Sequence, residues 1–150
     1  MRAVIQRVSQ ASVTIDNNTC CHIKNGLLIL LAVEHADNHE DLEWLSKKIV
    51  QLRIFNDHQG HMNQSVVDIK GQLLVVSQFT LYAKTKKGNR PSFIQAANAE
   101  KASKLYQQFI NQITIDSQLQ VTTGQFGADM QVQLINNGPV TIIIDTKNKE

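Results

Sequence analysis

A short polar segment, Ser77-Gln78-Phe79-Thr80, follows the apolar run that begins at Leu73. Hydroxyl and amide side chains at the end of a buried strand are typical of a site on a sheet, because loops at strand ends carry much of a fold's function. In a continuous strand Ser77 and Thr80 would point to opposite faces, so both can contact one ligand only if the chain turns there. The alternative interpretation is a polar strand end that caps the next segment.

A basic segment lies a few residues further along the chain. Within seven residues it holds four of the 15 lysines and arginines, although the formal net charge is only +2. The four cations are Lys84, Lys86, Lys87 and Arg90. Gly88 permits close backbone approach, and the cations can bind phosphates. A solvated loop is the alternative, but the clustering and the proximity to Ser77–Thr80 favour a phosphate site beside a functional one.

Two further segments combine glycine with a residue of special chemistry. Phe126 and Met130 flank a glycine-rich turn and can hold a base between them, although such residues are as often ordinary core. Asn136-Asn137-Gly138-Pro139 separates two predicted strands, where a Gly-Pro turn is unremarkable by itself. Each of these segments alone is a weak indication of function.

The usual catalytic and metal-binding motifs are missing from the sequence. It has no Gly-x-Ser-x-Gly elbow and no phosphate-binding P-loop. His35 and His39 are four residues apart but straddle a predicted helix start, and Cys20-Cys21-His22 falls in a predicted strand, where neighbours point to opposite faces. We therefore expect no metal and no cofactor.

The hydrophobic pattern predicts strands at both ends of the chain and two helices between them. The predicted strands are Val4–Val8, Ala11–Ile15, Cys20–Ile23, Leu27–Val33, Leu73–Gln78, Gln120–Thr123, Met130–Ile135 and Val140–Asp145, with a polar turn at Ser9-Gln10. One helix starts near Asp37, which forms a capping box with Glu40, and the other runs from about Asn98 to Ile113. This order predicts an α/β fold: a curled or double-layered mixed β-sheet with two helices packed on one face.

Composition limits the classes of protein further. A chain of 150 residues with 42% hydrophobic residues predicts one globular domain, residues 1–150. The longest apolar run, Gly26 to Val33, is too short to span a bilayer, which takes about 20 residues. Cys20 and Cys21 are adjacent and make no disulfide framework, so we expect a reduced, cytoplasmic protein without a membrane segment.

Taken together and in order, seven segments resemble the D-aminoacyl-tRNA deacylase family over nearly the whole chain. The segments are Gln6-Arg7-Val8, Leu52-Arg53-Ile54-Phe55, Met62-Asn63, Val76-Ser77-Gln78-Phe79-Thr80-Leu81, Lys87-Gly88-Asn89-Arg90-Pro91-Ser92-Phe93, Phe126-Gly127-Ala128-Asp129-Met130 and Gly138-Pro139-Val140-Thr141. The intact Ser-Gln-Phe-Thr segment favours the D-aminoacyl branch over a sister family specialised for a different mischarged tRNA. Lys84 and Asn137 depart from the family pattern, in which acidic residues are common at these positions.

The resemblance implies an enzyme that hydrolyses the ester bond of D-aminoacyl-tRNA, and of mischarged Gly-tRNA, and a homodimer with two active sites at its interface. It implies that Ser77, Gln78, Phe79 and Thr80 line the catalytic pocket and that Phe126 and Met130 hold the terminal adenine. Gly138-Pro139 would be cis, would reach into the partner's site and would exclude L side chains. The resemblance also implies that Arg7 orients this motif.

The resemblance leaves the nucleophile open. No histidine or lysine lies within the Ser77–Thr80 motif to activate a hydroxyl. We therefore expect the side chains to position the ester, backbone amides near Phe79 and Thr80 to stabilise the oxyanion, and the ribose 2′-hydroxyl to assist water. Thr80 as a nucleophile is the alternative. Two other classes compete with an editing enzyme: a nucleic-acid binding module without catalysis, and a small-molecule esterase that needs no basic loop.

Overall fold

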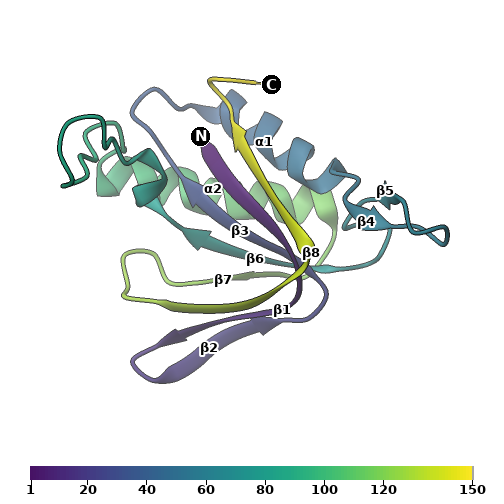
Figure 1. Ribbon diagram of the computed structural model, residues 1–150. Helices are drawn as coiled ribbons and strands as arrows, with labels where there is room; N and C mark the ends of the chain where they lie inside the picture. Colours follow the sequence, from purple (N-terminus) through teal and green to yellow (C-terminus); the bar gives the residue numbers. More distant parts are fainter. Residues whose placement is uncertain (150) are drawn as a thin grey trace.

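The computed structural model describes residues 1–149 as one mixed β-sheet, two α-helices and a small separate hairpin (Figure 1). The strands are β1 (Arg2–Ile15), β2 (Asn18–Ile23), β3 (Gly26–Ala32), β4 (Phe55–Asn56), β5 (Met62–Gln64), β6 (Gln72–Ser77), β7 (Val121–Thr123) and β8 (Gln131–Asp145). The helices are α1 (His39–Gln51) and α2 (Ala99–Ser117), with a 3-10 helix η1 at Phe79–Tyr82. Among the described residues no helix is long and apolar enough to cross a membrane.

The sheet is mixed, as predicted. Its order is β2-β1-β3-β6-β7, and β8 also pairs with β1. The pairs β3–β6 and β6–β7 are parallel, and the pairs that involve β1 are antiparallel. The parallel central strands place the carboxyl ends of β3, β6 and β7 at the same edge, which is the edge where the Ser77–Thr80 segment begins.

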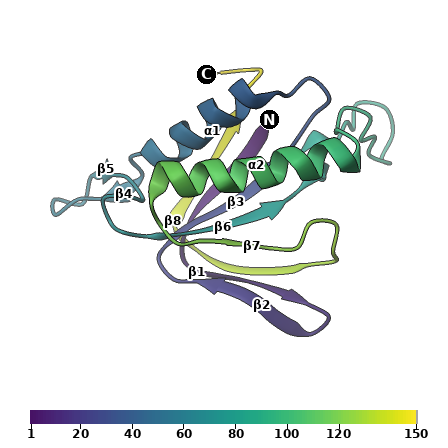
Figure 2. The same ribbon diagram turned by 180° about the vertical axis from the view of Figure 1, so that it is seen from behind.

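Both helices cover one face of the sheet, as predicted (Figure 2). The apolar stripe of α1 buries Leu42, Leu45 and Ile49, and that of α2 buries Phe109 and Ile113, all fully shielded from solvent. They pack in one core cluster against alternate residues of the sheet strands, Ile5, Leu27, Ile29, Leu73 and Val75. This layer fixes the central strands rigidly.

The sheet curls because β1 is long and changes neighbours along its length. Residues Arg2 to Val8 pair with β3, residues Ala11 to Ile15 pair with β2, and β8 follows β1 on its other side. A second buried cluster fills the inside of the curl, and its members are Val8, Ala11, Val13, Ile23, Leu28, Leu74 and Val76. The predicted curled sheet with helices on one face is therefore confirmed.

Several predicted boundaries were wrong. Ser9-Gln10 is not a turn: β1 continues through it, because without Gly or Pro the chain stays extended and only shifts its pairing with β8. Asn136 to Pro139 likewise lie within the single strand β8 rather than between two strands. The helix cap is Asn38, whose capping box uses Asp41. Asp37 is buried instead, and its carboxylate accepts a hydrogen bond from the Glu34 amide at 2.7 Å.

Candidate active site

A pocket of about 490 Å³ opens at the carboxyl ends of β3 and β6. Its walls come from these strand ends, the start of α2 and the loop between β7 and β8. The lining residues that carry the argument below are Ser77, Gln78, Phe79, Tyr106, Phe126 and Met130. The pocket thus brings together the polar segment after β6 and the glycine-rich segment before β8, which are about fifty residues apart in the sequence.

Ser77 and Gln78 enter the pocket because the β3–β6 ladder ends there. Ser77 is the last residue of β6 and pairs with Leu31, and the Gln78 amide donates to the Leu31 carbonyl at 2.8 Å. After Gln78 the chain turns into η1, so the turn that the sequence required between Ser77 and Thr80 is present. Both Ser77 and Gln78 are half-buried.

Phe79 and Thr80 lie at the rim of the pocket. Phe79 lines it with 56% of its surface exposed and packs edge-on against Phe93, with ring centroids 5.0 Å apart. Thr80 is exposed and is not among the lining residues; the Gln78 side-chain amide donates a hydrogen bond to its hydroxyl. The structure therefore brings Ser77, Gln78 and Phe79 into the pocket and leaves Thr80 one residue outside.

Phe126 and Met130 form another part of the pocket wall. The Phe126 ring lies 5.7 Å from the ring of Tyr106, which is buried and donates its hydroxyl to the Val75 carbonyl at 2.9 Å. Gly124 precedes this wall, and a Cβ at this position would lie only 2.5 Å from the Met130 sulfur. Glycine is therefore required there for Met130 to keep its place.

Gly138-Pro139 lies away from this pocket, in the middle of β8, and its peptide bond is cis. Both residues are exposed. The buried Arg7 holds this segment, because its Nε donates a hydrogen bond to the Asn137 carbonyl at 2.7 Å. Its Nη1 donates to the Ile54 carbonyl at 2.7 Å and so anchors the arginine itself. Gly138 has φ of 141°, and a Cβ there would lie 2.8 Å from Arg7 Nη2.

The basic segment forms an exposed loop directly after η1. The main chains of Lys84 and Ser92 close its base with two hydrogen bonds, 2.8 and 3.0 Å long. All four of its cations are exposed, and none lines the pocket; they are Lys84, Lys86, Lys87 and Arg90. Phe93, which follows the loop, packs on Phe79 and so ties the loop to the pocket rim.

The chemistry available in the pocket is mainly hydrogen bonding. Of its described lining residues none is a histidine, cysteine or lysine, and Asp129 is the one carboxylic acid. Burial raises the pKa of the Tyr106 phenol, so that this hydroxyl stays a neutral donor to the Val75 carbonyl. Within residues 1–149 no three or more His, Cys, Asp or Glu side chains gather as a metal site would require. The pocket can hold and orient a polar ligand, but it offers Ser77 no obvious base.

Sequence reasoning missed part of this pocket. Tyr106 lies beside the apolar stripe of α2, and its ring belongs to the helix–sheet core, so nothing in the sequence marked it as a pocket residue. Three small residues at the start of α2 leave room for the cavity, namely Ala97, Ala99 and Ala102. The spacing of small residues on the exposed start of the helix was the available indication, but alanine is too common in helices to be specific.

Comparisons with known proteins agree on one family. The model of the family described as D-Tyr-tRNA(Tyr) deacylase matches residues 4–145. A D-aminoacyl-tRNA deacylase of Flavobacterium psychrophilum is 61% identical over 150 residues, all of both chains. A protein of the same name from Bacteroides fragilis is 57% identical, again over the whole of both chains.

Solved structures share the fold. One named "c-Myc DNA Unwinding Element Binding Protein" has a TM-score of 0.92 and 40% identity, and the match covers 97% of this chain and 98% of that one. Another, named as a probable eukaryotic D-amino acid tRNA deacylase, has a TM-score of 0.81 at 18% identity, which supports the fold alone. Its match covers 95% of this chain and 97% of that one.

Proposed function

Because this chain belongs to the D-Tyr-tRNA(Tyr) deacylase family, we propose that it hydrolyses the ester that joins a D-amino acid to tRNA. The observation that carries this proposal is the single pocket shared by Ser77–Phe79 and by Phe126 and Met130. An aromatic ring and a thioether on one wall suit the adenine of the tRNA 3′ end. The hydroxyl of Ser77 and the amide of Gln78, which also line the pocket, suit the ribose and the ester.

In this proposal the residues position the ester rather than attack it. The backbone amides of Phe79 and Thr80 stabilise the oxyanion that develops when water attacks. The ribose 2′-hydroxyl of the terminal adenosine assists the water, since the pocket lacks a histidine or lysine. Thr80 is poorly placed as a nucleophile, because its hydroxyl lies outside the lining and accepts a hydrogen bond from Gln78.

Selection against L-amino acids is assigned to Gly138-Pro139 of a second subunit. Within one chain the segment lies outside the pocket, exposed on β8 and held by Arg7. A wall of backbone rejects any L side chain without recognising its identity, which suits an enzyme that accepts many D-amino acids. Glycine has no side chain to clash with the wall, so Gly-tRNA is expected to be a substrate.

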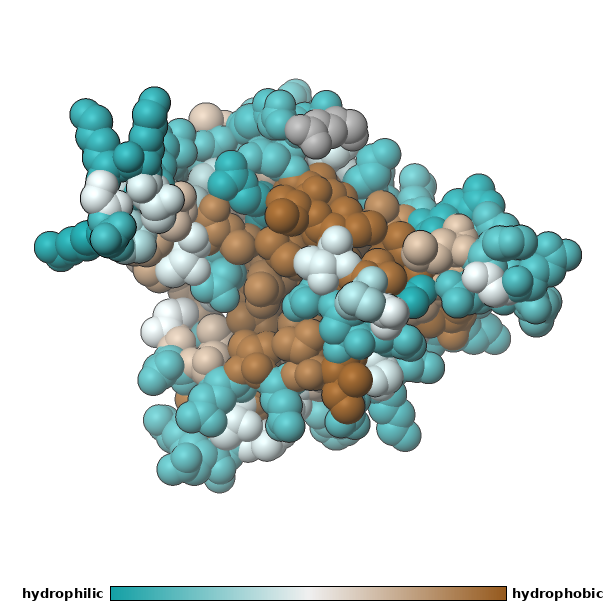
Figure 3. Space-filling model, viewed as in Figure 1, coloured by the Kyte–Doolittle hydropathy of each residue, from teal (hydrophilic) through white to brown (hydrophobic). Residues whose placement is uncertain are grey.

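A homodimer is supported by the sheet face opposite the helices. Figure 3 shows apolar side chains gathered on this face. On β8, Ile143 is 69% exposed, and Val4 of β1 is half-buried beside Ile143 in the strand pairing. A continuous apolar patch of this kind marks an interaction surface. Pairing two copies here would bury it and carry Gly138-Pro139, on the same strand, to a neighbouring pocket.

A deacylation assay tests the proposal. The purified protein is incubated without added metal with D-Tyr-tRNA, L-Tyr-tRNA and Gly-tRNA, and release of the amino acid is measured. Hydrolysis of the first and third, with L-Tyr-tRNA intact, is the expected result. Equal turnover of L-Tyr-tRNA would contradict the steric wall, and activity that vanished with EDTA and returned with zinc would contradict metal-free chemistry.

Nucleic-acid binding without catalysis is a second candidate, favoured by the neighbour named as a DNA unwinding element binding protein. The exposed loop from Lys84 to Arg90 would serve such a role equally well. The same assay separates the two candidates, because a pure binder leaves the ester intact. A small-molecule esterase would instead hydrolyse simple D-amino acid esters at the same rate whether or not RNA is attached.

A further inference from the structure

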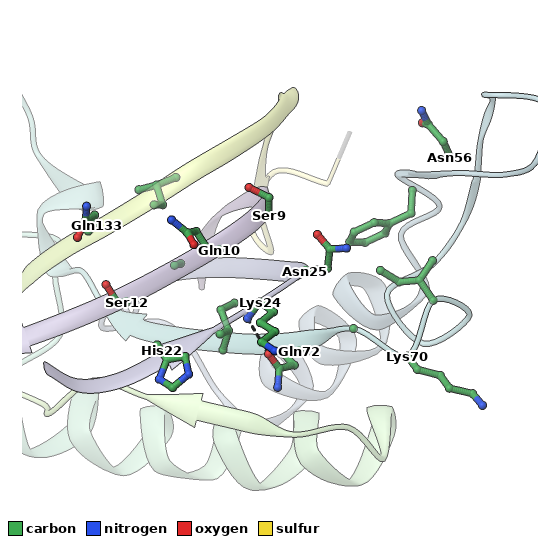
Figure 4. A pocket seen from close by; sticks show the side chains of 16 residues that line it. Ser9, Gln10, Ser12, His22, Lys24, Asn25, Asn56, Lys70, Gln72 and Gln133 are labelled. Carbon is green, nitrogen blue, oxygen red and sulfur yellow. Dashed lines mark hydrogen bonds between the residues drawn. The ribbon is translucent and has the colours of Figure 1, made fainter.

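A second and larger cavity, of about 990 Å³, lies at the other end of the parallel strands (Figure 4). Its lining includes Lys24 and Asn25, just before β3, and Gln72 at the start of β6. In the β3–β6 register Gly26 pairs with Gln72, and the paired residues at the pocket end are Leu31 and Ser77. Five residues of strand separate the two sites, which is about 16 Å. The cavity is therefore distinct from the candidate active site, and we call it the polar cleft.

The floor of the polar cleft is a row of polar side chains from three adjacent strands. Ser12 of β1 pairs with His22 of β2 on one side and with Gln133 of β8 on the other. Residues directly opposite each other on neighbouring strands point to the same face. All three line the cleft, and His22 and Gln133 are exposed. The row offers donors and acceptors about 5 Å apart.

The wall of the polar cleft is positively charged. Lys24 and Lys70 are exposed, and none of the sixteen described residues that line the cleft is Asp or Glu. Gln72 is held in place from both sides: its Oε1 accepts from the Lys24 amide at 2.7 Å and its Nε2 donates to Gln120 at 2.7 Å. Two cations, a histidine and the fixed amide of Gln72 fit a chain of phosphates and ribose hydroxyls.

The polar cleft lies next to Arg7, the residue that holds the Gly138-Pro139 segment. Asn56 lines the cleft, and its side-chain oxygen accepts from Arg7 Nη1 at 3.3 Å. Arg7 in turn donates to the Asn137 carbonyl. If Gly138-Pro139 enters the pocket of a second subunit, as proposed above, this cleft comes to lie beside that pocket. We expect an RNA whose terminal adenosine fills that pocket to pass this cleft.

We infer that the polar cleft is an RNA-backbone subsite, in which Lys24, Lys70 and His22 contact phosphates of the tRNA whose 3′ end lies in the other subunit's pocket. The inference rests on the proposed function for the identity of the RNA. It assigns to each subunit two tasks toward different tRNA molecules: hydrolysis of one and binding of the acceptor end of the other.

The decisive experiment compares two esters of D-tyrosine, one on tRNA and one on adenosine alone. The variant Lys24→Ala/Lys70→Ala is tested against the control Lys47→Ala/Lys104→Ala, which removes the same charge from exposed positions of α1 and α2. We expect kcat/KM for D-Tyr-tRNA to fall about 3- to 20-fold in the cleft variant only. The salt dependence of binding to a labelled acceptor-stem RNA is expected to lose about one to two units of slope. The adenosine ester is expected to react unchanged.

Each alternative gives a different result. Equal kcat/KM for tRNA in the cleft and control variants, or equal loss on both esters, overturns the subsite. If the unmodified protein hydrolyses neither ester, the proposed function fails, and the RNA-binding slope alone then decides whether the cleft binds RNA. A weaker homodimer in sedimentation velocity, caused by Lys24→Ala/Lys70→Ala, would show that the cleft contacts the second subunit instead.

Mixed dimers test which subunit's RNA the cleft serves. One subunit carries Phe126→Ala/Met130→Ala, which disables its pocket, and the cleft substitutions are placed either on this chain or on its partner. We expect slow turnover when both sets of changes share one chain, because the intact pocket then faces the altered cleft. Slow turnover in the opposite arrangement would overturn the assignment across subunits.

Discussion

The pocket at the strand ends and the Gly138-Pro139 segment are built in opposite ways. The pocket is assembled from side chains at strand ends, in η1, on α2 and on the loop before β8, with Phe79 largely exposed and Phe126 and Met130 on a glycine-rich turn. Gly138-Pro139 is backbone in the middle of a 15-residue strand, and its support is one buried arginine with uncharged oxygen acceptors. The difference suggests that side chains bind what all substrates share, the adenosine and the ester, whereas rigid backbone rejects what must be excluded.

Substitution of Arg7, which holds Gly138-Pro139, is expected to have the largest effect. It tests whether rejection of L-amino acids is separate from substrate binding in the pocket. Arg7→Ala deletes hydrogen bonds to the carbonyls of Asn137 and Ile54, so the segment can shift. A displacement of about 1 Å is enough to change rates about 100-fold. We expect the ratio of D-Tyr-tRNA to L-Tyr-tRNA turnover to fall by about that factor. Single-turnover deacylation of both substrates measures it.

One control variant and one matching variant accompany this prediction. Arg53→Ala removes an arginine that bonds Asn63 on the exposed β4–β5 hairpin, and it is expected to leave selectivity unchanged. Gly138→Ala should resemble Arg7→Ala, because the new Cβ would press on the Arg7 guanidinium. An Arg7→Ala protein that folds, as judged by circular dichroism, and keeps full selectivity would refute the supporting role of Arg7.

The binding wall is probed by Phe126→Ala. Stacking of a base on an aromatic ring contributes about 1–3 kcal/mol, which corresponds to a loss of roughly 5- to 150-fold in kcat/KM. Because this contact is common to all substrates, D-Tyr-tRNA and Gly-tRNA are expected to lose activity equally, with the D/L ratio unchanged. Ile115→Ala, which removes an exposed apolar side chain of α2 outside the pocket, serves as control. A changed D/L ratio in Phe126→Ala would mean that the two regions are not independent.

The sequence identified most of the site residues, but it could not predict which of them meet in one pocket. The ends of apolar strands and the glycine-rich turn pointed to Ser77–Thr80, Phe126 and Met130, because turn chemistry and strand ends are local properties. Their meeting in one pocket depends on the parallel pairing of β3, β6 and β7, which is a long-range property. The role of Arg7 toward Gly138-Pro139 was expected from family resemblance, not from the residues themselves.

The errors in the prediction have the same physical origin. Ser9-Gln10 was assigned to a turn by polarity alone, yet polar residues suit the exposed positions of a long strand equally well. The strand β8 was also divided in two, at Asn136 to Pro139, because a Gly-Pro pair is typical of turns. Tyr106 was not predicted as a pocket residue, since periodicity on a helix cannot tell a residue that faces a core from one that borders a cavity.

The basic loop from Lys84 to Arg90 is expected to contact tRNA phosphates outside both the pocket and the Gly138-Pro139 segment. Lys86→Ala/Lys87→Ala removes two exposed cations from the loop tied to the pocket rim by Phe93. Each phosphate contact contributes about 0.7–0.9 to the slope of log K against log salt, so the slope is expected to flatten by roughly one to two units. Filter binding of tRNA between low and physiological salt measures the slope. An unchanged slope would identify the loop as solvated surface.

The substitution Thr80→Ala is expected to have the smallest effect on turnover. Its result decides whether the Thr80 hydroxyl is the nucleophile. A hydroxyl nucleophile needs a base, and the described lining offers neither histidine nor lysine to activate one. The Thr80 hydroxyl also accepts a hydrogen bond from Gln78 at the rim, outside the lining. Thr80→Ala should therefore keep kcat within about fivefold of the unmodified protein, as expected for loss of one neutral hydrogen bond worth about 0.5–1 kcal/mol.

The matching change on the substrate should have the larger effect. A tRNA that ends in 2′-deoxyadenosine and is charged on its 3′-hydroxyl lacks the group proposed to assist water, so it should react far more slowly in both proteins. Complete loss of activity in Thr80→Ala, with an acyl-enzyme trapped by rapid quench in the unmodified protein, would instead make Thr80 the nucleophile. The pocket would then be a reactive site in its own right, and the division between a binding wall of side chains and a rejecting wall of backbone would have to be redrawn.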